Sequence, residues 1–326
     1  MKYLIFGGNG FVGRYLANKL IECGNNVSVF DIEPKLNENI NKQCKFSSID
    51  IRNRDGLRKI DIQPDDIVIN MAATQYHTHV PHNRSEYFFG TNAVGTRNIL
   101  EYTHAHGCRK YIMFTTDMTY GKPQYLPVDT HHPQNPFGPY GESKKECERI
   151  CREFRQKGMN ITIFRPRMIN GPGRLGILVK LFKLMDLGLP VPTIGNGKNH
   201  YQMVSVFDCV DAVVAAIEKG LPNKEYNLGS VGSPDITTLL SDTIKSTGSH
   251  SRVIHTPGKV VKWVLGVLDK IGMTIMYPEQ FMIADEEYVL DISETVADLD
   301  WNPQYNDADM LKMAYRMYKD NKQKKS

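Results

Sequence analysis

The sequence predicts an α/β protein with a doubly wound parallel sheet, and three observations lead to this prediction. Short runs rich in β-branched residues alternate with helical patterns through the first half of the chain. A glycine-rich turn, "FGGNGFVG" at 6–13, directly follows the first of these runs. The composition, 41% hydrophobic and 23% charged, is that of an ordinary globular protein. Strands that alternate with helices imply βαβ units, whose parallel strands need helices on both faces of the sheet.

The first half supplies six predicted strands with helices between most of them. The strands lie at 2–8, 26–31, 44–50, 66–73, 110–116 and 160–166. The helical patterns lie at 11–23, about 53–60, 84–106 and 140–157. This order is the one that parallel strands require, because each crossover between them needs a long connection that is usually a helix.

After Pro166 the pattern becomes less regular, and segments rich in Gly and Pro predict loops. The expected elements are helices at 208–218 and 236–247, an apolar helix at 258–272, a strand at 287–293 and a helix from about Asp307. Residues 1–167 are predicted to form the main domain, and residues 168–326 mainly a smaller lobe. Segments near 204–230 are expected to return to the main sheet.

Charge and hydropathy argue against two classes of partner. The 40 basic and 36 acidic residues give a net charge of +4, part of which lies in the tail after Lys319. We therefore expect no nucleic-acid partner. The most apolar stretch, 260–276, contains three charged residues, so we expect no stable membrane insertion. An amphipathic helix packed on its own protein is the expectation for this stretch.

The cysteines and histidines predict no metal site. The six cysteines are scattered, and only Cys147 and Cys151 lie close together, one helical turn apart. Their spacing matches no zinc motif, and unpaired thiols are typical of a reducing cytoplasm. Three histidines, His77, His79 and His82, follow the fourth strand. A solvated loop is the expectation for them, with substrate contact as the alternative.

The glycine turn predicts a dinucleotide site. Gly7, Gly10 and Gly13 allow a tight turn and a close approach of the backbone to phosphate, and the following helix N-terminus offers free N–H groups. Asp31 ends the second strand, where a carboxylate can bind both ribose hydroxyls and would repel a 2′-phosphate. The turn therefore predicts an NAD-binding Rossmann domain over 1–167. Asp50 and Ile51, after the third strand, are placed to meet the adenine.

A YxxxK pair supplies candidate catalytic residues. Tyr140 and Lys144 stand four residues apart at the start of a predicted helix, so both lie on one helix face. A nearby ammonium stabilises the phenolate and lowers the pKa of the tyrosine. Such a tyrosine can take a proton from an alcohol while a hydride leaves the same carbon. Thr116, at the end of the fifth strand, is placed to hydrogen-bond the same oxygen.

Taken together, these motifs resemble the extended short-chain dehydrogenase/reductases, specifically the NAD-dependent epimerases and dehydratases that modify nucleotide sugars. The resemblance covers nearly the whole chain. It rests on "GGNGFVG", "NMAA" at 70–73, "TNAVGTRN" at 91–98, "TTDMTYG" at 115–121, "YGESK" at 140–144, "RPRMINGPG" at 165–173, "VSVFDCVDA" at 204–212, "YNLGS" at 226–230 and "LDWNPQY" at 299–305.

The resemblance implies roles for individual residues. Tyr140 is the expected base, Lys144 the ligand of the nicotinamide ribose, and Thr116 the third member of the triad. The cofactor-binding set that it implies, together with the residues named above, is Gly7, Gly10, Phe11, Val12, Gly13, Asp31, Asp50, Ile51, Ala72, Ala73, Gln75, Asn92, Tyr140 and Lys144. It also implies a homodimer that packs the helices near 92–106 and 140–157 into a four-helix bundle.

Two departures from the family pattern bear on the chemistry. Sugar-nucleotide 4,6-dehydratases often carry Thr-Asp-Glu at 116–118, and here Met118 replaces the glutamate. A thioether is no base at neutral pH, so elimination lacks its usual proton acceptor. The family's diphosphate-binding arginine is replaced by Tyr201, and Arg167 and Arg174 are the expected substitutes. Asp117, Arg167, Arg174 and Tyr201 are the expected substrate contacts. For Asp117 the alternatives are a contact with a sugar hydroxyl and the remnant of an acid whose partner is gone.

The reading that these residues favour is an NAD-dependent nucleotide-sugar epimerase in the cytoplasm. Transient oxidation of a sugar hydroxyl, followed by hydride return, needs only the Tyr140 pair. A dehydrogenase or keto-sugar reductase of the same family is the alternative. A 4,6-dehydratase fits less well because of Met118, and a non-catalytic dinucleotide sensor fits less well because the Tyr/Lys pair is intact.

Overall fold

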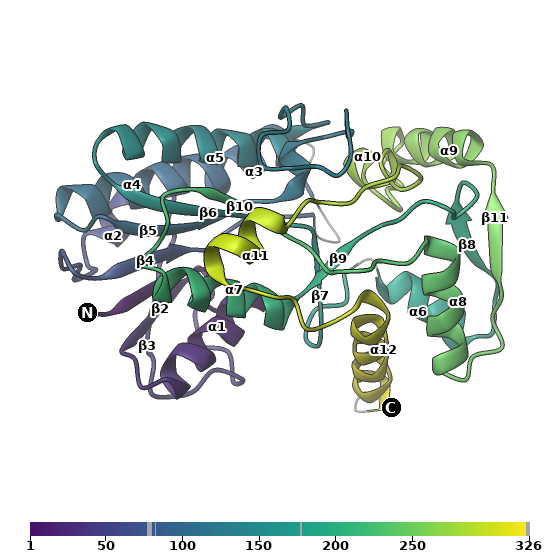
Figure 1. Ribbon diagram of the computed structural model, residues 1–326, viewed down its shortest axis with the longest axis horizontal. Helices are drawn as coiled ribbons and strands as arrows, with labels where there is room; N and C mark the ends of the chain where they lie inside the picture. Colours follow the sequence, from purple (N-terminus) through teal and green to yellow (C-terminus); the bar gives the residue numbers. More distant parts are fainter. Residues whose placement is uncertain (77–79, 82, 177, 324–326) are drawn as a thin grey trace.

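A seven-stranded parallel sheet forms the centre of the computed structural model, which describes residues 1–76, 80–81, 83–176 and 178–323 (Figure 1). The strand order is β10-β6-β5-β4-β1-β2-β3. The strands are β1 (Tyr3–Phe6), β2 (Val27–Asp31), β3 (Lys45–Ser48), β4 (Ile67–Asn70), β5 (Lys110–Phe114), β6 (Asn160–Pro166) and β10 (Glu225–Leu228). Every pairing is parallel, which confirms the predicted α/β fold.

The register of the strands decides where their following loops meet. Phe6 at the end of β1 pairs with Phe30 of β2 on one side and with Asn70 of β4 on the other. The chain order reverses between β1 and β4, so the loops after these two strands diverge to opposite sides of the sheet. A crevice opens at such a switch point, outside the carboxyl ends of the strands.

Helices cover both faces of the sheet (Figure 1). α1 (Phe11–Glu22) and α7 (Val206–Glu218) pack on one face, and α4 (Thr96–Ala105) and α5 (Pro139–Gln156) pack on the other. Successive strand residues point to opposite faces, so Ile5 belongs to the apolar core under α1 and Leu4 to the core under α5. Burial on both faces explains why these strands read as continuous apolar runs.

The helix predicted at 84–106 is divided into three parts. α3 (Arg84–Phe89) is followed by a π-helical segment, η1 (Gly90–Gly95), and then by α4. A side chain at Gly95 would overlap Ile51, so the glycine lets this segment approach the loop after β3. The predicted helix near 53–60 is only one turn long, α2 (Arg54–Leu57).

The smaller lobe combines short strand pairs with helices. Its strands pair as β7 with β9 and β8 with β11, and its apolar core joins α6, α8 and α12. These and the remaining elements are β7 (Met168–Asn170), β8 (Val191–Ile194), β9 (Met203–Ser205), β11 (Val253–Thr256), η2 (Asp117–Thr119), α6 (Leu178–Asp186), α8 (Ile236–Ser246), α9 (Gly258–Lys270), α10 (Pro278–Phe281), α11 (Ser293–Leu299) and α12 (Asp307–Gln323). β10 joins the main sheet beside β6, while the division at residue 167 stays a prediction.

The strand predicted at 287–293 is wrong. Tyr288 makes an isolated bridge with Tyr201, and Leu290 makes another with Val128. The segment passes two different neighbours with one residue each, so no continuous ladder forms. Its alternating apolar residues still face inward, because Tyr288 and Leu290 are buried.

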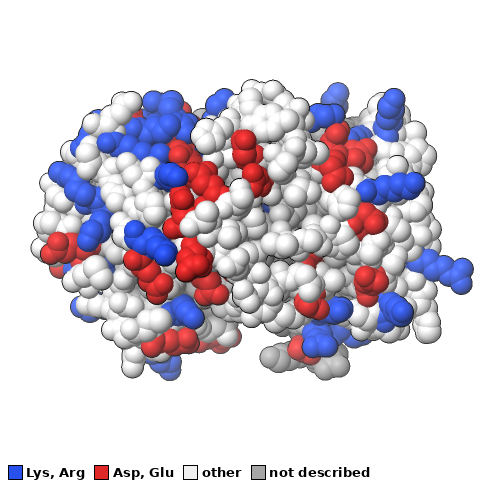
Figure 2. Space-filling model, viewed as in Figure 1, with Lys and Arg blue, Asp and Glu red and all other residues white. Residues whose placement is uncertain are grey.

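α9 packs on its own protein, as expected, but most of its apolar residues are exposed. Leu265 is the one described residue of α9 that is fully buried, whereas Trp263 is 69% exposed. Polar contacts hold the inner side of the helix: Lys262 pairs with Asp285, and Asp269 with Arg84. Within the described chain, no helix is long and apolar enough to cross a membrane. Figure 2 shows acidic and basic side chains interspersed over the visible face of the molecule.

Candidate active site

A cleft of about 1030 Å³ opens at the carboxyl ends of the central strands. It is wide enough for a dinucleotide with a second ligand beside it. Twelve of the fourteen expected cofactor-binding residues line it: Gly7, Gly10, Phe11, Val12, Gly13, Asp31, Asp50, Ile51, Ala72, Ala73, Gln75 and Lys144. The sequence motifs, scattered along the chain, are therefore brought together at the switch point of the sheet.

The glycine turn after β1 leaves no room for side chains. Gly7 has φ +74°, and a Cβ there would lie 2.5 Å from the backbone nitrogen of Ala72. A Cβ on Gly13 would lie 2.5 Å from the carbonyl oxygen of Gly7. Gly10 begins α1 without a capping side chain from any described residue, so the first N–H groups of the helix face the cleft. This cradle fits a pyrophosphate.

Replacement of Gly13 by alanine is expected to weaken NAD binding about tenfold or more, because overpacking against backbone costs about 1–3 kcal/mol. The extra methyl group must separate the turn from α1, since its nearest neighbours are backbone atoms of Gly7 and Gly8. Titration calorimetry with NAD would measure the loss. Gly90→Ala is the matched control, because a Cβ at Gly90 meets only Arg52 Cδ at 3.9 Å. Equal affinities for the two variants would contradict the cradle.

The adenosine end carries two carboxylates. Asp31 lies at the end of β2, lines the cleft and accepts the backbone N–H of Asn9 at 3.1 Å. Asp50 forms a 2.6 Å ion pair with Arg52, and the hydrogen bond from Arg52 lowers the pKa of Asp50. Asp31 has no such basic partner among the described residues, so its oxygens remain available to ribose hydroxyls.

The wall after β4 is held from behind by Asn92. Ala72, Ala73 and Gln75 line the cleft as expected, but Asn92 does not. Asn92 is fully buried; its Oδ1 accepts the N–H of Thr74 at 2.9 Å, and its amide donates to Ser143 Oγ at 2.9 Å. It therefore supports the wall and connects it to α5, while its place in the cofactor-binding set stays a prediction.

The catalytic triad is assembled from β5 and α5. Tyr140 is buried, and its hydroxyl group hydrogen-bonds Thr116. Lys144 lines the cleft one helical turn later, and its Nζ donates to the carbonyl oxygen of Phe114 at 3.0 Å. Burial lowers the pKa of Lys144. The carbonyl bond fixes the ammonium at the floor of the cleft, where a ribose would lie.

Several charges act on the Tyr140 hydroxyl. Burial raises the pKa of Tyr140, and the negative charges of Asp117 and Glu279 raise it further. Arg174 and the hydrogen bond with Thr116 lower it. The guanidinium of Arg174 lines the cleft and donates to Gln75 Oε1 at 2.5 Å. Arg174 is thus the cation that most favours the phenolate in this structure, a contribution that the YxxxK motif does not predict.

Three of the predicted substrate contacts form a buried cluster instead of lining the cleft. Asp117 pairs with Arg167. The guanidinium of Arg167 lies between the rings of Tyr201 and Tyr288, at 4.2 and 3.8 Å from their centroids. Arg167 Nε and Nη2 have no hydrogen-bond partner among the described residues. Asp117 is therefore neutralised by Arg167, and Arg174 is the one predicted substrate residue on the cleft.

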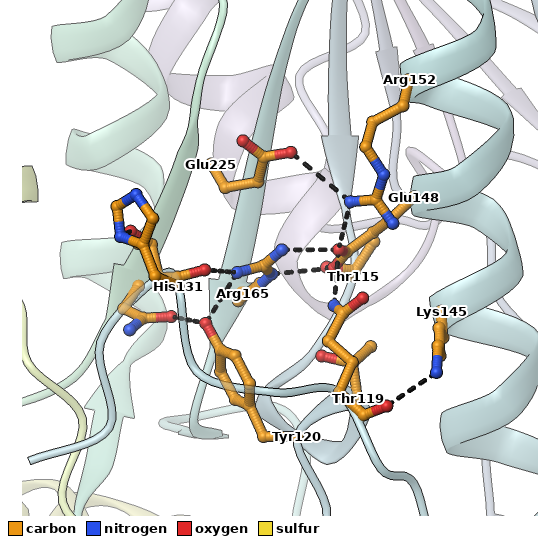
Figure 3. Close-up of polar contacts among 12 residues, drawn as sticks. Thr115, Thr119, Tyr120, His131, Lys145, Glu148, Arg152, Arg165 and Glu225 are labelled. Carbon is orange, nitrogen blue, oxygen red and sulfur yellow. Dashed lines mark hydrogen bonds and ion pairs between the residues drawn. The ribbon is translucent and has the colours of Figure 1, made fainter. Parts of the chain in front are cut away.

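A second buried ion pair supports the end of β5 (Figure 3). Arg165 donates to both carboxylate oxygens of Glu148, at 2.9 and 2.6 Å, and to the Tyr120 hydroxyl at 2.8 Å. Thr115 Oγ1 donates to Glu148 Oε1 at 2.9 Å. Glu148 comes from the same helix as Tyr140, so the network fixes the strand that carries Thr116 relative to α5.

Sequence reasoning missed one wall of the cleft. Tyr76, Lys180, Tyr277 and Gln280 line it, and Glu279 lies behind it. Tyr76 directly follows "NMAATQ", so that motif could have indicated it as a residue of the cleft. The segment around Tyr277 shows no periodic or spacing signal, and only tertiary folding brings it to the site.

Metal ligation finds no support in the described part of the chain. No group of three or more His, Cys, Asp or Glu residues there could hold a metal ion. The predicted loop histidines, His77, His79 and His82, lie outside the described residues.

Comparison with known proteins agrees with the dinucleotide-binding cleft described above. The model of the NAD dependent epimerase/dehydratase family matches residues 3–229. A Methanocaldococcus jannaschii protein described as a putative UDP-glucose 4-epimerase is 32% identical over 251 residues, 74% of this chain and 81% of the relative. The UDP-glucose 4-epimerase of Thermotoga maritima, solved with UDP-glucose, has a TM-score of 0.80 at 25% identity and covers 98% of this chain and 99% of its own.

Other relatives carry out different reactions. The chain is 27% identical over 271 residues to a UDP-N-acetyl-α-D-glucosaminuronate decarboxylase of Bacillus cytotoxicus, across 78% of this chain and 83% of the relative. A Bacillus cereus UDP-glucuronic acid 4-epimerase solved with its substrate and NAD has a TM-score of 0.78 at 22% identity, covering 98% of this chain and all of its own. The Bacillus cereus enzyme was solved with NAD, and the reactions named for these relatives differ.

Proposed function

The chain belongs to the NAD-dependent epimerase/dehydratase family, and we propose that it works as a nucleotide-sugar epimerase. The observation that carries this proposal is the Tyr140–Thr116 contact together with Met118 at the position of the elimination base. Met118 cannot accept a proton, and Asp117 is held by Arg167. These features support hydride transfer at one carbon over dehydration.

The proposed reaction begins with a proton transfer. Tyr140 takes the proton of a sugar hydroxyl, and Thr116 holds the same oxygen through its hydrogen bond. The glycine turn and Asp31 would hold NAD, which would supply reversible hydride transfer to and from the carbon that bears this hydroxyl. Arg174 stabilises the phenolate before the transfer, and Lys144 orients the ribose from the floor of the cleft. Tyr140 then gives the proton back to the alkoxide of the inverted carbon.

The substrate's diphosphate has two candidate cations on the cleft. Arg174 and Lys180 both line it, and Lys180 Nζ donates to the carbonyl oxygen of Ile275 at 2.5 Å. Arginine suits bidentate phosphate binding, and lysine acts as a point charge. Since Tyr201 packs on Arg167 inside the protein, we propose that Arg174 does the work of the arginine that this chain lacks at position 201.

A dehydrogenase or keto-sugar reductase is the second candidate, because the same triad serves it. The two differ in cofactor exchange: an epimerase regenerates NAD in each turnover, and a dehydrogenase releases NADH. Incubation with UDP-, dTDP-, GDP- and CDP-sugars, followed by mass spectrometry and NMR, separates them. We expect products of unchanged mass without added cofactor. Loss of water would indicate dehydration, and a stoichiometric rise in NADH absorbance would contradict epimerisation.

We further propose a cytoplasmic homodimer. All six cysteines are free, as expected in a reducing compartment. The dimer would pack α4 and α5 against the same helices of a second copy, and Val94, in η1 directly before α4, is 49% exposed. Light scattering after size exclusion would show the dimer, and Val94→Glu would reduce it to monomers.

A further inference from the structure

The helix that carries Tyr140 is capped by a residue from the other lobe. Gly138 is the N-cap residue of α5. It has no side chain that could accept the N–H groups of the first turn. Glu279 of α10 takes this role: its Oε1 accepts the backbone N–H of Tyr140 at 3.3 Å, and its carboxylate also accepts that of Gly141. The two partners are 139 residues apart.

The contact between Glu279 and the start of α5 is buried. Glu279 is 3% exposed, and a side chain at Gly138 would overlap its Oε1. A carboxylate at a helix N-terminus satisfies free N–H groups and meets the positive end of the helix dipole. A buried carboxylate is costly unless hydrogen bonds compensate it, and the N–H groups at the start of α5 supply such bonds.

Aromatic rings connect the same carboxylate to the cleft. The Tyr76 hydroxyl hydrogen-bonds Glu279, and the Tyr76 ring meets the Tyr140 ring edge-on at 5.6 Å. Tyr76 stacks on Tyr277 at 4.4 Å, and both rings line the cleft. Glu279 thus contacts Tyr140 through the backbone and, by way of Tyr76, through its ring.

We infer that Glu279 is a positioning residue for Tyr140, by which the substrate lobe sets the place and the ionisation of the catalytic phenol. This inference rests on Tyr140 being the acid–base residue of the proposed function. The lobe that binds the substrate then also completes the N-terminus of the catalytic helix. Separation of the lobes would uncap α5 and move the phenol.

The inference makes the Tyr140 hydroxyl sensitive to the charge of Glu279. The groups from other elements that act on this hydroxyl are Arg174, Asp117, Glu279, Thr116 and Tyr76, and Asp117 is itself paired with Arg167. Glu279 is the one carboxylate of this set without a cationic partner among the described residues. Its negative charge disfavours a phenolate beside it, so its removal makes the phenolate easier to form.

The test uses Glu279→Gln and Glu279→Leu in the NAD-bound protein. Tyr140 ionisation is followed by tyrosinate absorbance, with the matching Tyr140→Phe variant subtracted. In Glu279→Gln, which keeps an N–H acceptor and loses the charge, we expect titration about one pH unit lower, the effect of one nearby charge. We expect the kcat of Glu279→Leu to be about tenfold lower than the kcat of Glu279→Gln, because the leucine removes the helix cap. The affinity for NAD should stay unchanged.

Glu142→Gln is the matched control, because Glu142 is exposed in the same first turn of α5. It should titrate as the wild-type protein does. The absorbance titration needs no substrate, so it stands even if epimerisation is refuted. If Glu279→Gln titrated as the wild-type protein does, the inference would be overturned. This holds even if Glu279→Leu failed to fold. A kcat of Glu279→Leu equal to that of Glu279→Gln would overturn it as well.

Discussion

Tyr140→Phe is expected to lower kcat by about 10²–10⁴-fold, the usual contribution of a positioned acid–base group. The variant removes one oxygen from a ring that stays packed against Tyr76 and Phe88. The fold and the cofactor cleft should therefore persist. Turnover of the accepted nucleotide sugar is the measurement, with NAD affinity measured in parallel.

Tyr125→Phe is the control for this substitution. Its hydroxyl group donates to Asp129 on the surface, and its side chain is 44% exposed. It should turn over within about twofold of the wild-type protein, as surface changes usually do. If Tyr140→Phe kept wild-type kcat, the assigned proton transfer would be refuted. If it lost NAD binding as well, the defect would lie in the cleft and not in the proton transfer.

Arg165→Met is expected to lower the free energy of unfolding by about 3–5 kcal/mol, because it leaves one charge of a buried pair uncompensated. Glu148 is fully buried and would lose two charge-assisted hydrogen bonds. The Tyr120 hydroxyl would lose a donor in the same change. Urea unfolding of the purified protein would measure the loss.

Two further variants separate the buried charge from simple loss of contacts. Arg149→Met removes a bidentate pair with Glu146 at a side chain that is 55% exposed, and it should cost less than about 1 kcal/mol. Adding Glu148→Gln to Arg165→Met removes the stranded charge and should recover part of the stability. The deficit of Arg165→Met should also shrink at acidic pH, because protonation of Glu148 removes its uncompensated charge. A deficit no larger than that of Arg149→Met would contradict the role of the network.

Local patterns predicted the main sheet well because both faces of its strands are buried. Such strands appear as continuous apolar runs, and the ends of β1 and β2 agree with prediction to within two residues. The segment at 287–293 shows the limit of this reasoning. Its alternating apolar and polar residues indicate only that one side of the segment is buried. A segment that crosses two unrelated neighbours shows the same alternation as a strand.

The apolar helix at 258–272 shows a second limit. Sequence gives the stripe of Val260, Trp263, Val264 and Val267 but not the direction in which it faces. Two ion pairs, Lys262 with Asp285 and Asp269 with Arg84, turn the polar side inward. Both partners come from distant parts of the chain, and no local signal marks them.

The sequence by itself determined the α/β fold, the glycine turn, Asp31 and the Tyr140–Lys144 pair, because each depends on neighbours a few residues away. Only the tertiary structure decided which polar side chains reach the cleft. It paired Asp117 with Arg167 inside the protein, turned Arg174 toward Tyr140 and brought Glu279 to the start of α5. The pairing of Asp117 with Arg167 spans 50 residues and that of Tyr140 with Glu279 spans 139, so local spacing carries no information about them.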